Sequence, residues 1–286
     1  MMRGSRRKFL SDSARAAPAA LASSWLARLA NSNPLGRPIG IQLYTVRDAM
    51  QADAAGTLKT LRAIGFAEVE TAGVGGLSAA QFRTLLDDAG LSCPSAHLNL
   101  DPANLGRAFE DAHALGARYA ASGSLPAAPP QRTAELANRI GEAAGRAGLQ
   151  YAYHNHDAEF AAGSDGMAPY DVLLRETDPR LVKFEIDCGW MIFAGRDPSA
   201  YFEKYPDRFP LIHVKDFLPP TGTSTNTAKV MAGAELGTGA VDYKPIFAAA
   251  KKAGLRHYFV EQEGPFSRVT PLEAARIDYD YLHALR

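Results

Sequence analysis

Residues 181–187 read LVKFEID, a short apolar run with two acidic residues, Glu185 and Asp187, near its carboxyl end. Short runs of β-branched and aromatic residues that close on polar residues are typical of β-strands. The same arrangement recurs at residues 211–215, LIHVK, and at residues 257–261, HYFVE. The sequence therefore places side chains capable of chemistry where predicted strands end.

Eight runs of this kind follow one another after Pro38, at intervals of roughly 25–35 residues. Ala- and Leu-rich stretches between them predict helices, and a glycine follows each of five such stretches, where a helix typically stops. The predicted strands are Ile39–Tyr44, Ala67–Thr71, Leu91–Leu98, Arg118–Ser122, Leu149–Asn155, Leu181–Asp187, Leu211–Lys215 and His257–Glu261. The predicted helices include Ala54–Ile64, Ala79–Ala89, Leu105–Leu115, Arg132–Ala147 and Tyr243–Ala253.

Eight alternating strand–helix units predict an α/β fold, a (β/α)₈ TIM barrel that covers residues 37–286. A doubly wound parallel sheet is the competing architecture. Its phosphate-binding signature, GxGxxG after the first strand, is missing, and GVGG at residues 73–76 lacks the required spacing. No linker or change of composition interrupts residues 37–286, so a single domain is expected.

Composition excludes several function classes. The 286 residues include 31 Lys+Arg and 31 Asp+Glu, so the formal net charge is zero. Proteins that bind nucleic acid or anionic membranes through their charge need a positive excess, so both classes are disfavoured. The two cysteines, Cys93 and Cys188, form no CxxC motif, and a disulfide scaffold is excluded at this size. What remains is a globular protein, with enzymes as the expected class.

Residues 1–36 are expected to be a leader rather than part of the fold. SRRKFL at residues 5–10 resembles a twin-arginine export signal. An Ala-rich, weakly apolar stretch follows it, with a small-residue cleavage site at residues 20–22. This predicts a periplasmic or secreted protein, or a cytoplasmic one if the segment is only a frayed basic helix. Twin-arginine export carries folded protein, so a metal could be loaded before export.

The carboxyl ends of the predicted strands carry an unusual number of polar side chains. In a TIM barrel these ends meet at one mouth, and inward positions alternate along each strand. Buried charges need a partner, so such a ring indicates a divalent cation; Mn²⁺, Mg²⁺, Zn²⁺ and Co²⁺ suit mixed imidazole and carboxylate ligands. The residues concerned are Gln42, Tyr44, Glu70, His97, His154, Asn155, His156, Asp157, Glu159, Glu185, Asp187, His213, Lys215, Asp216, Glu261 and Glu263.

Three of these residues, Asp187, His213 and Glu261, end successive predicted strands, and they are predicted to share one metal ion. Each has a simpler interpretation. A lone Asp at a strand end is commonly a helix cap, and a lone His in a strand is commonly a hydrogen-bonded core residue. Glu185 could likewise pair with Lys183 or Lys215. The convergence of three neighbouring strands favours the metal site over three separate structural roles.

Five segments follow one another in the order IGIQLYTVR at residues 39–47, YHNHD at 153–157, EIDCGW at 185–190, IHVKD at 212–216 and VEQE at 260–263. Together they resemble the xylose isomerase-like (β/α)₈ superfamily, which includes sugar isomerases and epimerases, inosose dehydratase and apurinic endonucleases. LGTGAVDY at residues 236–243 matches the Gly-rich loop that those proteins place before the seventh helix. The resemblance covers about residues 37–286 and is strongest to secreted bacterial proteins of the sugar phosphate isomerase/epimerase type.

In the epimerases of that superfamily, Glu, Asp, His and Glu from strands five to eight hold one divalent metal. The ligands that the resemblance implies here are His154, Asp187, His213 and Glu261. This sequence departs at strand five, where His154 takes the place of glutamate, with Glu159 and His156 as further candidates. It also has Trp190 where relatives often carry a histidine. The strand-five glutamate transfers a proton in the epimerases, so their two-glutamate mechanism does not carry over directly.

The resemblance implies a polyhydroxy carbonyl substrate, such as a sugar or keto-sugar. The metal would polarise the carbonyl, a base would take the proton from the adjacent carbon, and Lys215 would stabilise the oxyanion. Return of that proton gives isomerisation or epimerisation, which is the main expectation. Loss of a β-hydroxyl would instead dehydrate a keto-sugar or inosose, and loss of a β-alkoxy group would cleave a 3-keto glycoside. The candidate catalytic residues are Glu261, Glu263, Glu159, His156 and Lys215.

Other function classes fit this sequence less well. An apurinic endonuclease uses a three-zinc cluster rich in histidine, and Trp190 occupies one such place. A serine hydrolase of the GxSxG type is disfavoured because the motif is missing. A non-catalytic periplasmic sugar-binding protein is the remaining alternative, because the strand-five glutamate is absent. The expected partner is therefore a small sugar, with no nucleic acid and, after export, no membrane.

Overall fold

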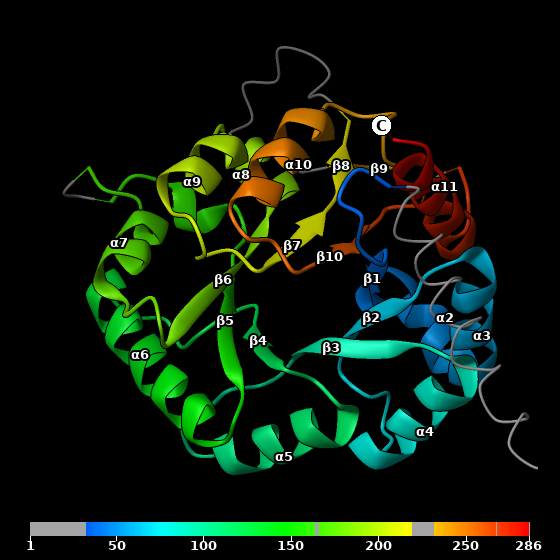
Figure 1. Ribbon diagram of the computed structural model, residues 1–286, viewed down its shortest axis with the longest axis horizontal. Helices are drawn as coiled ribbons and strands as arrows, with labels where there is room; N and C mark the ends of the chain where they lie inside the picture. Colours follow the sequence, from blue (N-terminus) through cyan, green and yellow to red (C-terminus); the bar gives the residue numbers. More distant parts are fainter. Residues whose placement is uncertain (1–32, 164–165, 219–231, 267, 286) are drawn as a thin grey trace, which may run out of the picture.

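Eight parallel strands form a closed barrel, which confirms the predicted (β/α)₈ fold. The computed structural model describes residues 33–163, 166–218, 232–266 and 268–285. The barrel strands are β1 (Gly40–Gln42), β2 (Glu68–Ala72), β3 (Ser92–His97), β4 (Tyr119–Ser122), β5 (Gln150–His154), β6 (Val182–Asp187), β7 (Leu211–Val214) and β10 (His257–Val260). Their order around the barrel is β1-β10-β7-β6-β5-β4-β3-β2, and β1 pairs with both β10 and β2. Figure 1 looks onto these strands with the helices around them.

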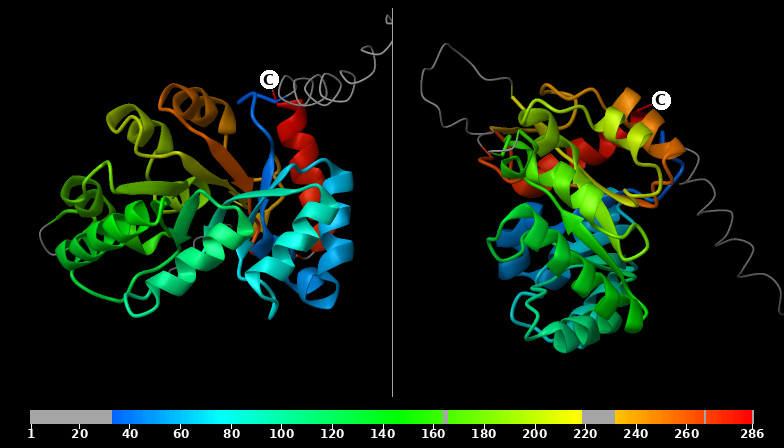
Figure 2. Two further views of the ribbon diagram at one scale, coloured as in Figure 1. Left: turned by 60° about the horizontal axis from the view of Figure 1, so that its bottom comes forward. Right: turned by 90° about the vertical axis from the view of Figure 1, so that its left-hand side faces the viewer.

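The helices cover the outside of the barrel. They are α2 (Arg47–Ala52), α3 (Ala54–Ile64), α4 (Ala79–Ala89), α5 (Leu105–Leu115), α6 (Pro130–Arg146), α7 (Pro169–Glu176), α8 (Cys188–Phe193), α9 (Pro198–Lys204), α10 (Tyr243–Lys252) and α11 (Pro271–Ala284). Two 3₁₀ turns, η1 (Leu43–Val46) and η2 (Ala158–Phe160), and a short antiparallel pair, β8 (Asp216–Phe217) with β9 (Gly233–Ala234), complete the described elements. Figure 2 shows α11 beside α3, where the end of the chain closes the ring of helices.

Local signals fix several helix ends where the sequence predicts them, and α3, α4 and α5 have the predicted bounds. At the start of α4, the Ser78 side chain accepts a hydrogen bond from the Gln81 backbone, and the Gln81 side chain accepts one from the Ser78 backbone. This reciprocal pairing satisfies two amide groups that a helix start leaves without partners. The helix ends at Gly90, whose φ of 71° lies in the left-handed region that glycine adopts without strain.

The first strand is shorter than the sequence predicts. The predicted strand Ile39–Tyr44 ends at Gln42, because the Gln42 side chain accepts a hydrogen bond of 3.2 Å from the Tyr44 backbone and starts the 3₁₀ turn η1. An amide side chain that binds the backbone two residues on favours a turn over continued pairing. Tyr44 therefore lies outside the barrel sheet, at the mouth of the barrel, and 41% of its surface is exposed.

Side chains of β6 alternate between the inside of the barrel and the layer under the helices. Phe184 and Ile186 are fully buried and face outward, where the ring of Phe184 packs against that of Tyr170 at 5.4 Å. Glu185 and Asp187 face inward, because strand residues two apart share a face. Burial of apolar residues on one face of this strand thus fixes the acidic residues on the other.

A small apolar cluster separates the two ends of the barrel interior. Ala121, Ala152, Leu211 and Phe259 form this cluster, with the ring of Tyr119 packed against it. These residues come from four different strands, β4, β5, β7 and β10. The layer divides the polar groups at the carboxyl ends of the strands from those at the amino ends.

The described chain begins with a turn that belongs to the barrel. Residues 1–32, which hold most of the predicted export leader, lie outside the described residues, so that signal stays a prediction. Leu35 falls within the predicted leader, yet it packs in the hydrophobic core, and the Asn33 side chain donates a hydrogen bond of 2.8 Å to the Arg37 carbonyl. Within the described parts of the chain, the helices are too short or too polar to cross a lipid bilayer.

One buried carboxylate organises the Gly-rich loop before α10. Asp216 Oδ1 accepts hydrogen bonds from the backbone of Phe217 and Val241, at 2.9 and 3.0 Å. Its Oδ2 accepts two more, from Gly237 and Gly239, at 3.0 and 3.1 Å. These four amide donors satisfy the buried carboxylate of Asp216.

Replacing Asp216 by asparagine is expected to lower the free energy of unfolding by about 2–4 kcal/mol. The amide group keeps one acceptor oxygen but turns an NH₂ toward two backbone N–H donors. Asp242, the exposed N-cap of α10, provides the matched control, because asparagine also caps helices well. Urea unfolding of both variants measures the difference, and equal stabilities would contradict the role of Asp216.

Candidate metal centre and active site

Three of the predicted metal ligands lie together at the carboxyl ends of β6, β7 and β10. His213 Nδ1 lies 3.0 Å from Glu261 Oε2 and 3.9 Å from Asp187 Oδ2. The ligand atoms of these residues, which we call the Asp187 cluster, all lie within 4.8 Å of one another, and all three residues are buried. Atoms so placed can converge on one ion at metal–ligand distances of about 2.0–2.2 Å.

A second group of possible ligands shares His213. Glu185 Oε2 lies 2.6 Å from His97 Nε2 and 3.3 Å from both His154 Nδ1 and His213 Nε2. We call these four residues the Glu185 cluster. The sequence interpretation placed His154 with Asp187, whereas the structure places it beside Glu185. The alternative pairing of Glu185 with Lys183 or Lys215 is wrong, because Glu185 pairs with histidines inside the barrel.

Glu70 on β2 fixes the orientation of His213. Its Oε2 accepts hydrogen bonds from Gln42 Nε2 at 2.8 Å and from His213 Nε2 at 2.6 Å, and Ser95 Oγ donates to Oε1. Burial alone would raise the pKa of Glu70, but His97 and His213 lower it to about 2. Glu70 is therefore ionised, and His213 directs Nδ1 toward the Asp187 cluster. Metal-binding histidines commonly donate their other ring N–H to a carboxylate in this way.

Buried acceptors without donors show that this region suits a cation. Among the described residues, His154 Nδ1 and Glu185 Oε1 are buried and have no aligned hydrogen bond, and Asp187 Oδ2 has only the ion-pair contact with Lys215. Each such atom costs about 1–3 kcal/mol unless a positive group satisfies it. Two carboxylates and an imidazole in the Asp187 cluster are a donor set that a divalent ion accepts. The residues present therefore fit a metal ion.

Lys215 supplies one positive charge to the Asp187 cluster. Its Nζ lies 3.0 Å from Asp187 Oδ2 and 2.9 Å from Glu261 Oε2, and it also pairs with Glu263. Burial would lower the pKa of Lys215, but Asp187, Glu261 and Glu263 raise it, so the side chain stays an ammonium at neutral pH. The lysine thus occupies the same carboxylate oxygens that would bind a metal.

Burial shifts the pKa values of Glu185 and His154, two members of the Glu185 cluster. It raises the pKa of Glu185 to about 7, with the charge of Glu70 acting in the same direction. Burial also lowers the pKa of His154 well below its ordinary value, helped by the charges of His213 and His97. His154 is therefore neutral near pH 7, which is the form that binds a metal.

The predicted catalytic residues divide between the cavity and its surroundings. A cavity of about 210 Å³ opens above the two clusters, and His156, Glu261 and Glu263 line it. Glu263 is held by Lys215 and by Trp190 Nε1, which donates to its Oε1 at 3.0 Å. The remaining lining residues are Gln42, Tyr44, Ala72, His97, Gly123 and His154.

Glu159 lies outside both clusters. Its Oε1 accepts a hydrogen bond of 3.0 Å from the Tyr153 hydroxyl, and its Oε2 accepts one of 3.2 Å from the His156 backbone. Glu159 thus positions the loop that carries His156.

The sequence predicts His97, Glu185 and Glu70 as polar residues at strand ends but assigns them no role as metal ligands. Their position at the carboxyl ends of predicted strands does place all three at the barrel mouth.

Comparison with known proteins agrees with this architecture. A family model described as xylose isomerase-like TIM barrel matches residues 58–284. An inosose dehydratase from Lacticaseibacillus casei is 31% identical over 163 residues, which cover 54% of this chain and 54% of that protein. The chain therefore spans about half the length of the curated relatives it matches.

Two solved structures have the same fold over most of their length. A crystal structure of a sugar phosphate isomerase/epimerase from Parabacteroides distasonis has a TM-score of 0.71 and 26% identity, covering 86% of this chain and 94% of that one. A xylose isomerase-like TIM barrel protein from Mycobacterium smegmatis, solved in complex with magnesium, has a TM-score of 0.63 and 20% identity, covering 88% and 97%. The second likeness concerns the fold alone.

Proposed function

Because this chain belongs to the xylose isomerase-like TIM barrel family, we propose that it is a metal-dependent lyase that removes water from a keto-sugar or inosose. The observation that carries the proposal is the Asp187 cluster, whose buried acceptors border a cavity lined by His156 and Glu263. The curated relatives named inosose dehydratases favour this reaction over the isomerisation that the sequence resemblance put first.

The metal would be held by Asp187 Oδ2, His213 Nδ1 and Glu261 Oε2. A divalent ion such as Mn²⁺, Mg²⁺, Zn²⁺ or Co²⁺, when bound there, polarises a substrate carbonyl and increases the acidity of the adjacent carbon. Glu70 keeps the His213 ring in the orientation this requires, and the apolar layer below the site keeps water from entering from the other end of the barrel.

The protein groups then move the protons. Glu263, whose side chain is 33% exposed, takes the proton from the carbon next to the carbonyl, and Lys215 stabilises the negative charge that develops on oxygen. His156, which also lines the cavity, gives a proton to the β-hydroxyl. The C–O bond breaks, a carbon–carbon double bond forms, and water leaves. Tyr44 at the cavity mouth offers an exposed ring on which a sugar face can stack.

Isomerisation or epimerisation is the second candidate function. The Parabacteroides distasonis structure, which covers 86% of this chain, supports it. Both reactions begin with the same proton removal, so the ligand set does not separate them. They differ in whether the proton returns to carbon or a β-substituent departs.

One experiment separates these functions. The purified protein is analysed for bound metals, depleted with a chelator, reloaded with Mn²⁺, and incubated in D₂O with inososes, ketoses and 3-keto glycosides. We expect metal-dependent loss of water from an inosose or keto-sugar, seen as an unsaturated ketone product. Deuterium uptake without elimination would instead assign an isomerase or epimerase, and release of an alcohol would assign glycoside cleavage. Metal binding without any reaction would indicate a sugar-binding protein.

A further inference from the structure

A second cavity lies at the opposite end of the barrel from the Asp187 cluster. Its volume is about 520 Å³, within the range of small-molecule sites. The residues that line it come from the amino ends of the strands: Tyr119 begins β4, Lys183 is in β6, and Arg256 directly precedes β10. The apolar layer around Phe259 separates this cavity from the candidate active site.

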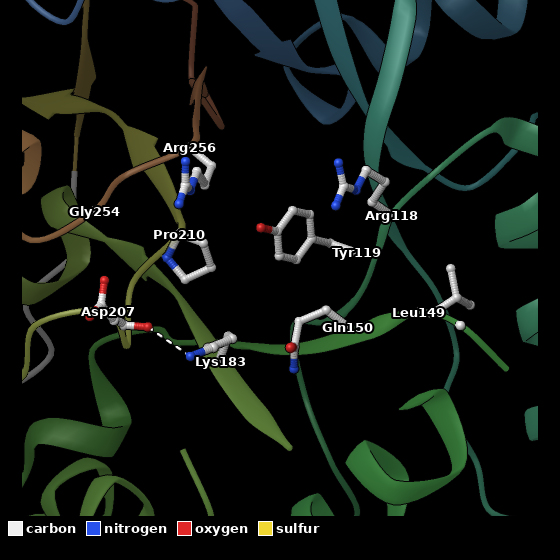
Figure 3. Close-up of a pocket in the computed structure, with 10 residues that line it drawn as sticks. Arg118, Tyr119, Leu149, Gln150, Lys183, Asp207, Pro210, Gly254 and Arg256 are labelled. Carbon is white, nitrogen blue, oxygen red and sulfur yellow. Dashed lines mark hydrogen bonds between the residues drawn. The ribbon is translucent and has the colours of Figure 1, made fainter. Parts of the chain in front are cut away.

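Positive charge dominates the lining of this cavity. Arg118, Lys183 and Arg256 face a single acidic residue, Asp207. Lys183 Nζ donates a hydrogen bond of 2.9 Å to the backbone carbonyl of Asp207, so that bond holds the ammonium in place without neutralising it. Figure 3 shows the three cationic side chains around the cavity, with the bond from Lys183 to Asp207 dashed.

The two arginines have no competing partners within the described ranges. Their guanidinium groups make no hydrogen bond or ion pair with another side chain there, whereas exposed arginines elsewhere, such as Arg83 and Arg107, pair with aspartates on their own helices. A guanidinium has five N–H donors in a planar fork that matches oxyanions. Arg118 and Arg256 therefore retain their full donor capacity for a ligand.

Tyr119 adds a neutral donor between the arginines. Figure 3 shows its ring between Arg118 and Arg256, with the hydroxyl directed toward Pro210 and Arg256. Burial raises the pKa of this hydroxyl, while Arg118, Arg256 and Arg37 act in the opposite direction because they lie close to it. The hydroxyl keeps its proton at neutral pH and can donate it in a hydrogen bond.

We propose that this basic cavity binds the phosphoryl group of a small molecule, either free phosphate or a phosphate ester. Two guanidinium forks, one ammonium and one hydroxyl approach from different sides. A guanidinium fork binds carboxylates and phosphates alike, but a phosphoryl group concentrates up to two negative charges on oxygens that point in several directions, so this set of donors favours it over a planar carboxylate with one charge. The remaining volume accommodates the body of an ester against the Tyr119 ring. This site is independent of the metal centre, so both can be occupied at once.

Isothermal titration calorimetry tests the proposal with inorganic phosphate, glycerol 3-phosphate and, as a planar dicarboxylate, succinate. The two phosphates are expected to bind and succinate to bind at least about tenfold more weakly. In the double variant Arg118→Gln/Arg256→Gln, phosphate affinity is expected to fall about tenfold or more. The control Arg132→Gln removes an exposed arginine of α6 that pairs with Glu135, and its affinity is expected to stay within about twofold of the parent.

A second variant separates the two ends of the barrel. Asp187→Asn alters the Asp187 cluster and is expected to leave phosphate affinity unchanged. Binding of either phosphate compound supports the proposal. If inorganic phosphate binds more tightly than glycerol 3-phosphate, the ligand is free phosphate, and the reverse order indicates a phosphate ester. The proposal is overturned if neither phosphate binds, if succinate binds equally well, or if the double arginine variant keeps the phosphate affinity of the parent protein.

Discussion

Exchanging Asp187 for asparagine is expected to remove the bound metal and to lower kcat/KM by about a thousandfold or more. Asparagine has nearly the same volume, and its oxygen can still accept the hydrogen bond of 2.8 Å that the Trp190 backbone donates at the start of α8. The fold is therefore expected to survive. The substitution removes one negative charge from a site with three ligands. Glu261 and His213 then remain, and two ligands bind a metal ion only weakly.

Elemental analysis and turnover on the substrate identified in the D₂O experiment measure this effect. The matched control is Asp197→Asn, which makes the same change at the exposed N-cap of α9. Its metal content and activity are expected to equal those of the parent protein. Full activity with unchanged metal in Asp187→Asn would show that the Asp187 cluster is not the metal centre.

Lys215→Met is expected to separate metal binding from catalysis. The ammonium lies 3.0 Å from Asp187 Oδ2 and 2.9 Å from Glu261 Oε2, so it repels a cation that binds the same oxygens. Its removal is expected to tighten metal binding about tenfold. Without the ammonium, the developing oxyanion loses a stabilising charge, and kcat is expected to fall about 10²- to 10³-fold.

The opposite signs of these two effects make the test specific. Metal titration followed by calorimetry gives the affinity, and initial rates at saturating metal give kcat. Lys251→Met, an exposed lysine near the end of α10, is the control and is expected to change neither quantity. If metal affinity falls together with activity, Lys215 holds the carboxylates in place rather than competing for them.

The sequence predicts the barrel and the Asp187 cluster because both depend on signals within single strands. Apolar residues such as Phe184 and Ile186 set the outward face of β6, and Asp187 then points inward at its end. The Glu185 cluster depends on distances across the barrel: His97 on β3 reaches Glu185 on β6, and Glu70 on β2 reaches His213 on β7. Which inward residues meet across the interior follows from strand tilt and register, which a single sequence does not specify.

The basic cavity was missed for a related reason. Arg118 is the first residue of one predicted strand and Arg256 directly precedes another, and charged residues at the amino end of a strand do not by themselves indicate a site. Only the closed barrel brings these two positions and Lys183 to the same opening. The first strand ends at Gln42, before the predicted end at Tyr44, for a local reason. The Gln42 side chain accepts a hydrogen bond from the backbone two residues ahead, and this bond competes with strand pairing.

The alternation along β6 has a consequence for how this protein can change. Lys183 lines one opening of the barrel, while Glu185 and Asp187 serve the other, and all three belong to one side of a six-residue strand. Insertion or deletion of a single codon within residues 182–187 would invert the alternation on one side of the change, so that apolar residues there would face the barrel interior and charged residues would lie beneath the helices. New specificity at either opening is therefore expected to arise through point substitutions and altered loop lengths, while the length of this strand stays constant among descendants of the chain.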